Sequence, residues 1–501
     1  MRGRRIIRYH NWGERTLIRF TDIIKAFVGG IARSKVSLLG AIMATVTFPV
    51  LLVSAMLDMQ GVVENPYFGF IIYMVLGPTF LLGLLLVFLG LFFFKGKEEV
   101  GIFTYDYLKE QFTEPDKFVR VRKFIMLATG LTLLNIFIVL LTSYTGYHYT
   151  ESVAFCGQFC HTVMAPEYTA YQNSPHSRVK CVECHIGSGA QWFAKSKISG
   201  VRQLFAVALG TYSRPIETPV HGLRPARETC EECHRPELFH GEKLYVKDKY
   251  LPDEKNTHVQ TVLLMKVGHG GYRGQQAHGI HWHVAPENKI TYTHTDRARQ
   301  QISEVVLEKR DGTKIVFASD RAAESAPDGK QEGGVRVMDC VDCHNRPTHI
   351  YLTADEALDL KMLGGKIPTA LPFIKQQALE VVNKEYVSTE EAKNSIATQL
   401  RTWYQEKYPA LYKSNILMIE QAITGIQQAY EENVFPSMKI GWNTYPNFLG
   451  HKNESGCFRC HDDGHTTKAG GTISMDCETC HIILAEDEPA PEILKTLRGS
   501  K

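Results

Sequence analysis

The sequence predicts a mostly α-helical protein in which a three-helix transmembrane anchor precedes an exterior domain of short helices, irregular chain and a small β-rich insertion. Three observations lead to this fold class: long apolar runs within the first 145 residues, six cysteine–histidine motifs in the remainder, and a strand-like pattern between residues 235 and 339. The net charge of +3 over 501 residues does not favour a nucleic-acid partner, and no nucleic-acid-binding motif is visible.

The apolar runs occupy residues 36–57, 68–94 and 124–144, and none of them contains Asp, Glu, Lys, Arg or His. Each run reaches the roughly 20 residues that an α-helix needs to cross a bilayer core of about 30 Å. Pro49 and Pro78 are expected to kink the first two helices, which membrane bundles tolerate. The first run and its basic leader are too long for a cleaved signal peptide, so we predict a retained anchor over residues 1–145.

The charges that flank these runs predict the topology. Residues 1–35 and 95–123 are rich in Lys and Arg, whereas residues 58–67 contain neither. Because positively charged loops stay in the cytoplasm, the N-terminus and the second loop are expected there. Three crossings then place everything after residue 144 on the outer side of the membrane.

All 12 cysteines lie in six motifs in which the second cysteine of a pair is followed at once by a histidine. Numbered 1 to 6 along the chain, the pairs are Cys156/Cys160, Cys181/Cys184, Cys230/Cys233, Cys340/Cys343, Cys457/Cys460 and Cys477/Cys480, followed by His161, His185, His234, His344, His461 and His481. Motifs 2–6 read C-x-x-C-H, the attachment signature of c-type haem. The thiols form thioethers with the haem, and the histidine becomes an axial ligand of its iron. Motif 1 has a third spacer residue, and this longer loop can still reach both haem vinyl groups.

Other interpretations of the motifs explain less. Disulfides would not require a histidine after every pair. A zinc ribbon uses paired Cys/His knuckles without a fixed trailing histidine, and a thioredoxin-like motif occurs once, beside a βαβ pattern. We therefore predict six covalently attached c haems, which are redox centres and imply that the protein moves electrons.

The exterior part is organised around the motifs. Its segments are 146–234, with motifs 1–3 on short helical stretches; 235–339, with an apolar strand-like run at 258–267 and a hairpin of 302–308 and 314–318; 340–349, with motif 4; 350–434, with helical periodicity; and 435–501, irregular chain around motifs 5 and 6. Haem is large and apolar, so much of the buried surface is expected to be porphyrin wrapped by irregular chain. Haem removal is therefore expected to unfold the domain.

Each six-coordinate iron needs a second axial ligand, and histidines outside the motifs can provide it. They are His148, His176, His221, His240, His258, His269, His278, His281, His283, His294, His349, His451 and His465. We favour His176, His221, His349 and His451, which lie close in sequence to a motif. The cluster at residues 276–283 could supply distal ligands or bind an additional non-covalent haem or metal, and the sequence leaves both open. Met164 could replace histidine at one iron and raise its potential.

Residues 156–185, 224–234 and 340–349 resemble the NapC/NirT family of membrane-anchored cytochromes, which has NrfH-like and CymA-like members. The three predicted anchor helices and the two additional motifs resemble the ImcH-like inner-membrane cytochromes more closely still. This resemblance implies a tetrahaem core at residues 146–349 with the insertion 235–339, and an extension at 350–501 that carries two further haems. It also implies a multi-pass protein of the bacterial inner membrane with its haem domain in the periplasm.

The resemblance also implies a function. The family takes electrons from quinol, here menaquinol, and passes them to periplasmic c-type cytochromes in anaerobic or extracellular metal respiration. It implies that the first haem lies near the membrane and has a methionine ligand soon after motif 1, which is Met164 here. A lysine after motif 2 is also implied as a ligand, with Lys195 and Lys197 as candidates. This chain differs from the usual family pattern in its longer first motif, its three predicted spans and its insertion.

Quinol oxidation releases two electrons and two protons, so the reaction is expected where the third predicted helix meets the haem domain, around residues 144–151. His148 is a candidate proton acceptor because histidine titrates near neutral pH, and Glu151 and Glu167 are alternatives. A competing function is a terminal reductase that reduces a small molecule itself. Such an enzyme needs an open iron coordination site, whereas all six motifs here end in histidine.

Overall fold

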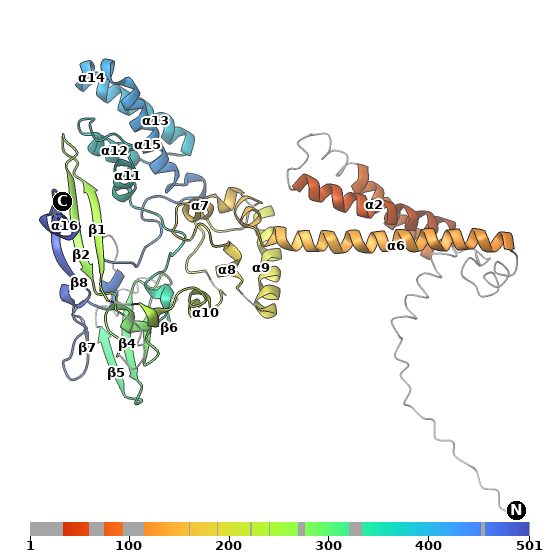
Figure 1. The fold of residues 1–501 in the computed structure, drawn as a ribbon, viewed down its shortest axis with the longest axis horizontal. Coiled ribbons are helices and arrows are strands. Elements are labelled where there is room, and N and C mark those ends of the chain that lie inside the picture. The colour runs from red at the N-terminus through yellow and green to blue at the C-terminus, as the bar shows by residue number, and fades with distance from the viewer. Residues whose placement is uncertain are drawn as a thin grey trace, which may run out of the picture. The chain divides into compact units, whose positions relative to one another are not determined.

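The computed structural model describes residues 34–59, 75–93, 115–159, 161–187, 189–220, 223–239, 241–268, 276–319, 333–451 and 456–499. The chain forms two compact units, Met1–Thr150 and Glu151–Lys501 (Figure 1). We refer to them as the first and the second unit. Helices dominate both, and the second unit also contains two antiparallel sheets.

The described part of the first unit consists of helices α2 (Lys35–Met59), α4 (Gly77–Phe92) and α6 (Pro115–Thr150). Within α2, residues Lys35–Ser54 are long and apolar enough to cross a membrane, which agrees with the first predicted span. The stretch Gly77–Gly90 in α4 is apolar but shorter, and the ends of the second predicted span lie outside the described residues. The third predicted span lies inside the continuous helix α6. The three-span anchor therefore stays a prediction.

Small residues bring α2 and α4 into close contact. A Cβ added to Gly40 would lie 2.5 Å from the backbone oxygen of Gly83, and one added to Gly90 would lie 2.4 Å from the backbone nitrogen of Ser37. The Ser37 hydroxyl donates a hydrogen bond to the carbonyl of Val87 at 2.9 Å. Close backbone approach through small residues is how membrane helices associate, because apolar burial drives no association in lipid.

The first half of the second unit is built from short helices. They are the π-helix η3 (Phe155–Phe159), α7 (His161–Gln172), α8 (Cys181–His185), α9 (Ala190–Ala208), α10 (Ala226–Cys230) and the 3-10 turn η4 (Pro236–Leu238). Motif residues occur in η3, α7, α8 and α10, so the motifs themselves adopt helical turns. This agrees with the prediction of short helical stretches around motifs 1–3.

One sheet has the strand order β1-β2-β8 and the other β6-β3-β4-β5-β7. The strands are β1 (Lys243–Tyr250), β2 (His258–Met265), β3 (Asn288–His294), β4 (Ile302–Lys309), β5 (Lys314–Ser319), β6 (Gly334–Val337), β7 (His465–Thr466) and β8 (His481–Glu488). The predicted hairpin is confirmed, because β4 and β5 are antiparallel neighbours with Glu308 opposite Lys314.

The β-rich region is not a self-contained insertion. Strand β8 pairs with β2, and Met265 lies opposite His481. Strand β7 completes the other sheet beside β5. Both strands come from the segment for which the sequence predicts irregular chain around motifs 5 and 6. The 3-10 turns η9 (Gly456–Arg459) and η10 (Cys477–Thr479) and helix α16 (Glu492–Arg498) also lie in that segment.

Residues 354–431 form a helical layer of α11 (Ala354–Leu363), α12 (Ile374–Val382), α13 (Thr389–Lys407), α14 (Pro409–Ser414) and α15 (Ile416–Glu431). Thr353 and Ser388 cap α11 and α13, since each hydroxyl accepts a hydrogen bond from a backbone N–H in the first turn. The layer confirms the predicted helical periodicity.

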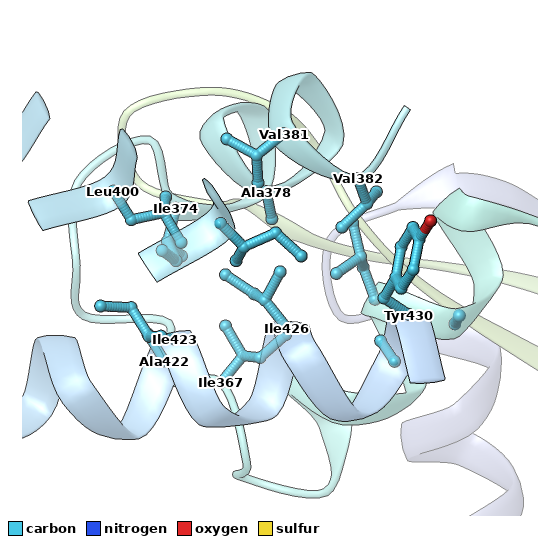
Figure 2. Close-up of a cluster of buried hydrophobic side chains, with 14 of the residues drawn as sticks. Ile367, Ile374, Ala378, Val381, Val382, Leu400, Ala422, Ile423, Ile426 and Tyr430 are labelled. Carbon is cyan, nitrogen blue, oxygen red and sulfur yellow. The ribbon is translucent and has the colours of Figure 1, made fainter. Parts of the chain in front are cut away.

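The helical layer has an apolar core of buried side chains (Figure 2). Ile367, Ile374, Ile426 and Leu400 are at most 1% exposed. Burial of each such side chain contributes about 1.5–3 kcal/mol to folding. Protein side chains therefore form a large buried core in this part of the chain, which contains no haem motif.

A first prediction follows from this core. Protein expressed without haem attachment should retain the helical layer and lose the structure around the motifs. Hydrogen exchange should find the amides of α12 and α15 protected and those of α8 and η9 unprotected. If α12 and α15 exchanged as fast as α8, the layer would depend on haem after all.

Candidate haem centres

Motifs 3, 4 and 5 share one backbone geometry. The backbone N–H of the motif histidine bonds the carbonyl of the first cysteine, at 2.8 Å for His234, 2.9 Å for His344 and 3.0 Å for His461. Each of these three motifs is thus a single helical turn, whereas His481 of motif 6 begins strand β8. Residues four apart on such a turn share a face, so the first cysteine and the histidine point to the same side. This is the arrangement that a covalently attached haem needs over its axial histidine.

Motif 1 differs in its backbone. Residues Phe155–Phe159 form a π-helical turn, which is wider by one residue than an α-turn and absorbs the additional spacer residue. Gly157 is buried in this turn, and a Cβ there would lie 2.2 Å from the ring of Tyr168. Cys160 lies outside the described residues.

Cysteines of successive motifs are neighbours in space. The thiols of Cys156 and Cys181 form a hydrogen bond, which joins motifs 1 and 2, and those of Cys230 and Cys340 form another, which joins motifs 3 and 4. Cysteines of the remaining successive motifs lie near enough to influence one another's thiol pKa: Cys184 and Cys233, Cys343 and Cys457, and Cys457 and Cys480. The motifs therefore follow one another in space in the order of the sequence.

Four motif histidines each face a histidine from elsewhere in the chain. The ring centroids are 6.1 Å apart for His185 and His349, 5.9 Å for His234 and His176, 5.8 Å for His461 and His283, and 6.1 Å for His481 and His451. An iron held between two imidazoles at metal–nitrogen bonds of about 2 Å separates the ring centres by roughly 6 Å. The four pairs have this spacing.

Backbone carbonyls orient the histidines that lie opposite the motifs. Nδ1 of His176 lies 3.1 Å from the Pro347 carbonyl, and Nδ1 of His283 lies 2.8 Å from that of Ile280. Nδ1 of His349 lies 3.0 Å from the Glu167 carbonyl. A proton on Nδ1 that is donated to a carbonyl leaves Nε2 unprotonated, which is the usual arrangement of a metal-binding histidine.

Protein atoms around the rings also favour the neutral imidazole. Burial lowers the pKa of His185 to about 4, and the nearby His349 adds to this effect, although the His185 side chain remains accessible to solvent. Burial likewise lowers the pKa of His283. The neutral form is the one that binds a metal.

The histidine of motif 4 has a different neighbourhood. His281 and His234 are close enough to His344 to lower its pKa, after the larger effect of burial. Nδ1 of His281 lies 3.1 Å from the Val267 carbonyl, and its ring packs against Phe239 at 5.0 Å. His281 therefore has the same carbonyl anchor as the histidines that face motifs 2, 3 and 5.

The favoured histidines His176, His349 and His451 each face a motif histidine, whereas His221 lies outside the described residues. The sequence alone does not assign His281 and His283. The two histidines are two residues apart in the 3-10 turn η5 (Ile280–Val284), which follows Gly279 at φ 69°. This local spacing points their rings in different directions. No group of three or more His, Cys, Asp or Glu side chains in the described residues is placed to hold a metal ion.

Other histidines serve the fold. His465 is buried, with Nδ1 2.9 Å from the Asp462 carboxylate and Nε2 3.1 Å from the Ile302 carbonyl. Nε2 of His258 lies 2.8 Å from Asp248. His278 lines a cavity of about 280 Å³ that also touches Thr479 of motif 6.

Charged residues gather beside motif 1 in the second unit. Lys197 on α9 donates to Glu151 at 2.5 Å, and both lie close enough to Cys156 to interact with its thiol. Lys195 instead lies over the ring of Trp192 at 4.7 Å. Met164 is half-buried on α7, one helical turn after His161.

The two remaining candidates occupy different surroundings. Glu167 on α7 lies beside the haem-facing histidines rather than at the start of the unit: its carboxylate is 3.0 Å from Nδ1 of His349 and 4.0 Å from Arg346. His148 lies in the last turn of α6 in the first unit, where its ring contacts Tyr144 at 4.4 Å and Tyr147 at 5.4 Å.

Comparison with related sequences also identifies the chain as a c-type cytochrome. The profile of the NapC/NirT cytochrome c family, N-terminal region, matches residues 119–219, which contain motifs 1 and 2. The chain belongs to this family of c-type cytochromes, so it carries covalently bound haem c and takes part in electron transport. The predicted family resemblance is confirmed.

Two individual proteins of known name are similar to this chain. The chain is 39% identical over 466 residues to the cytochrome c-type protein ImcH of Geobacter sulfurreducens, and the match covers 92% of this chain and 90% of ImcH. It is 33% identical over 104 residues to the cytochrome c-type protein NrfH of Wolinella succinogenes, which is 20% of this chain and 58% of NrfH. No solved structure matches the chain.

Proposed function

We propose that this protein takes electrons from menaquinol in the bacterial inner membrane and delivers them, through six covalent c haems, to a periplasmic c-type cytochrome. The observation that carries the proposal is the order of the motifs. A cysteine of each motif lies near a cysteine of the next motif along the chain, from Cys156 near Cys181 to Cys457 near Cys480. Six redox centres held in this order form one continuous route. Haem, when bound, supplies the one-electron redox chemistry.

We further propose the distal ligands. His349 serves the haem of motif 2, His176 that of motif 3, His281 that of motif 4, His283 that of motif 5 and His451 that of motif 6. Centroid distances near 6 Å support the assignments of His349, His176, His283 and His451. The assignment of His281 is supported by its closeness to His344 and by its Nδ1 contact with the Val267 carbonyl. For motif 1 we propose that Met164, one turn after His161 on the same helix, replaces histidine as a ligand of the iron. His221 remains a candidate outside the described residues.

At the quinol end, this chain's own residues take up the protons. We propose that His148 and Glu151 accept them, since both occur where the third predicted span leads into motif 1. Glu151 also pairs with Lys197, whose Nζ lies 2.5 Å from a carboxylate oxygen. Glu167 is proposed instead to orient His349, because its carboxylate and carbonyl both lie 3.0 Å from Nδ1 of that ring.

At the other end, motif 6 is the proposed exit. Cys477 is solvent-exposed, and so is Glu478 between the two cysteines. Exposure allows a partner's haem to come close to the haem of motif 6. The three-span topology, with a four-haem core at 146–349 and a two-haem extension at 350–501, completes the proposal.

The test is a haem count joined to a reduction assay. The purified protein should exceed its polypeptide mass by six haems, and a menaquinol analogue should reduce those haems within the full-length protein. A mass that corresponds to five haems would exclude motif 1. Six haems with no reduction by the quinol would overturn the proposed donor and leave the haem assignment standing.

A further inference from the structure

Motifs 4 and 5 each have a charged and buried residue immediately before the second cysteine. Asp342 precedes Cys343 and is 1% exposed, and Arg459 precedes Cys460 and is 9% exposed. Spacer residues lie between the two haem-bearing cysteines. Each of these charged residues is thus the direct neighbour of a haem-bearing cysteine, and a low effective dielectric constant strengthens the influence of a buried charge.

The Asp342 carboxylate is the centre of a hydrogen-bond network. The Tyr292 hydroxyl donates to it at 2.7 Å, and Nε of Arg336 lies 2.9 Å and 3.1 Å from its two oxygens. The backbone N–H of Asp339 donates at 2.7 Å, and Arg299 completes the set at 3.4 Å. Burial and the neighbouring Asp342 raise the pKa of Tyr292, so this phenol stays protonated and remains a donor.

Arg459 extends the network from motif 5 to motif 4. Its guanidinium donates to the backbone carbonyl of Asp342, a contact between residues 117 positions apart in the chain. It also donates to the carbonyl of Arg299 at 3.0 Å and to that of Gly456 at 2.8 Å. Its guanidinium carbon lies 3.8 Å from the centre of the Phe448 ring.

A second contact runs parallel to the first. Asn345, the residue after the motif 4 histidine, accepts a hydrogen bond from the backbone of Phe448 at 2.9 Å and donates to the carbonyl of Pro446 at 2.8 Å. Both ends of motif 4 are therefore fastened to the segment that leads into motif 5.

The charges within this network do not cancel. Three arginines, Arg299, Arg336 and Arg459, meet two carboxylates, Asp339 and Asp342. A positive charge close to a haem disfavours the oxidised iron, which is itself more positive. Removal of the Asp342 charge would leave the buried arginines uncompensated.

We infer that Asp342 and Arg459 form a positioning and potential-setting link between the fourth and fifth haems. The inference rests on the proposed six-haem route. The link joins the four-haem core to the two-haem extension. Motifs 4 and 5, which it connects, are separated in the sequence by the helical layer. Asp342 and Arg459 act through the haems that they hold and do not touch the quinol.

The test uses full-length protein with Asp342→Asn, which keeps the side chain's shape and removes its charge. A potentiometric titration followed by electron paramagnetic resonance should show two haems with raised midpoint potentials and four unchanged. Tyr292→Phe removes one hydrogen-bond donor whose dipole offsets the negative charge of the carboxylate. The midpoint potentials of the same two haems should therefore fall. Opposite shifts from these two variants would not arise from a merely structural role.

Arg459→Met and Arg459→Lys test the positioning part. After Arg459→Met protein is mixed with a menaquinol analogue, four of its haems should be reduced at the normal rate and two more slowly. Arg459→Lys should recover part of the lost reduction rate. Arg401→Met is the matched control, because it breaks an ion pair to Glu420 in the helical layer. Six haems with unchanged potentials in Asp342→Asn and Tyr292→Phe would overturn the inference, whereas a missing haem signal in unmodified protein would instead overturn the proposed function.

Discussion

Protein truncated to Glu151–Lys501 should carry six haems and show no reduction by menaquinol. The reason is positional: menaquinol is confined to the bilayer, and the helix that is long and apolar enough to cross a membrane belongs to the first unit. The measurement is the absorbance of reduced haem after addition of a menaquinol analogue in detergent, with full-length protein alongside. Dithionite should reduce both proteins completely, which controls for haem content. Rapid reduction of the truncated protein by the quinol would contradict the proposed entry of electrons at the membrane.

Substitution of His349 by Met should raise the midpoint potential of one haem and leave the other five unchanged. Axial ligands set haem potentials over a range of roughly 0.8 V, and a methionine thioether favours the reduced iron more than an imidazole does. His349 faces His185 at 6.1 Å and is anchored by Glu167, so the affected haem should be that of motif 2.

The matched control for this variant is His258→Met. His258 lies 2.8 Å from Asp248 and stacks on Tyr250 at 4.8 Å, so protein groups within its own sheet already engage its ring. Its substitution should leave all six potentials in place. Identical titration curves for His349→Met and unmodified protein would remove His349 from the ligand set.

Local chemistry makes much of this protein predictable. The cysteine pairs and their histidines are contiguous in sequence, so their helical turns follow from the motif itself. The same holds for the hairpin of β4 and β5, whose turn lies between two strands that are neighbours in the chain. The helical layer is predictable because its apolar positions repeat with the helical period, and residues that cap α11 and α13 precede those helices.

Long-range pairing is not predictable in this way. Strand β8 begins at His481, so its first residue already belongs to a haem motif, and its partner β2 ends more than two hundred residues earlier. The same limit applies to His283, whose partner His461 lies far along the chain. Only tertiary packing brings such residues together, and no periodicity in the sequence reports it. The arginines around Asp342 carry no sequence signal for the same reason.

The two C-terminal strands also set the order in which the protein can be assembled. Strands β7 and β8 are the last to leave the ribosome, yet each completes a sheet whose other strands are synthesised much earlier. Under the proposed topology, neither sheet can close until almost the whole chain has been exported. Motifs 1 to 4 therefore reach the compartment of haem attachment while the sheets are still open, and the attachment machinery has access to them before the last strands are added.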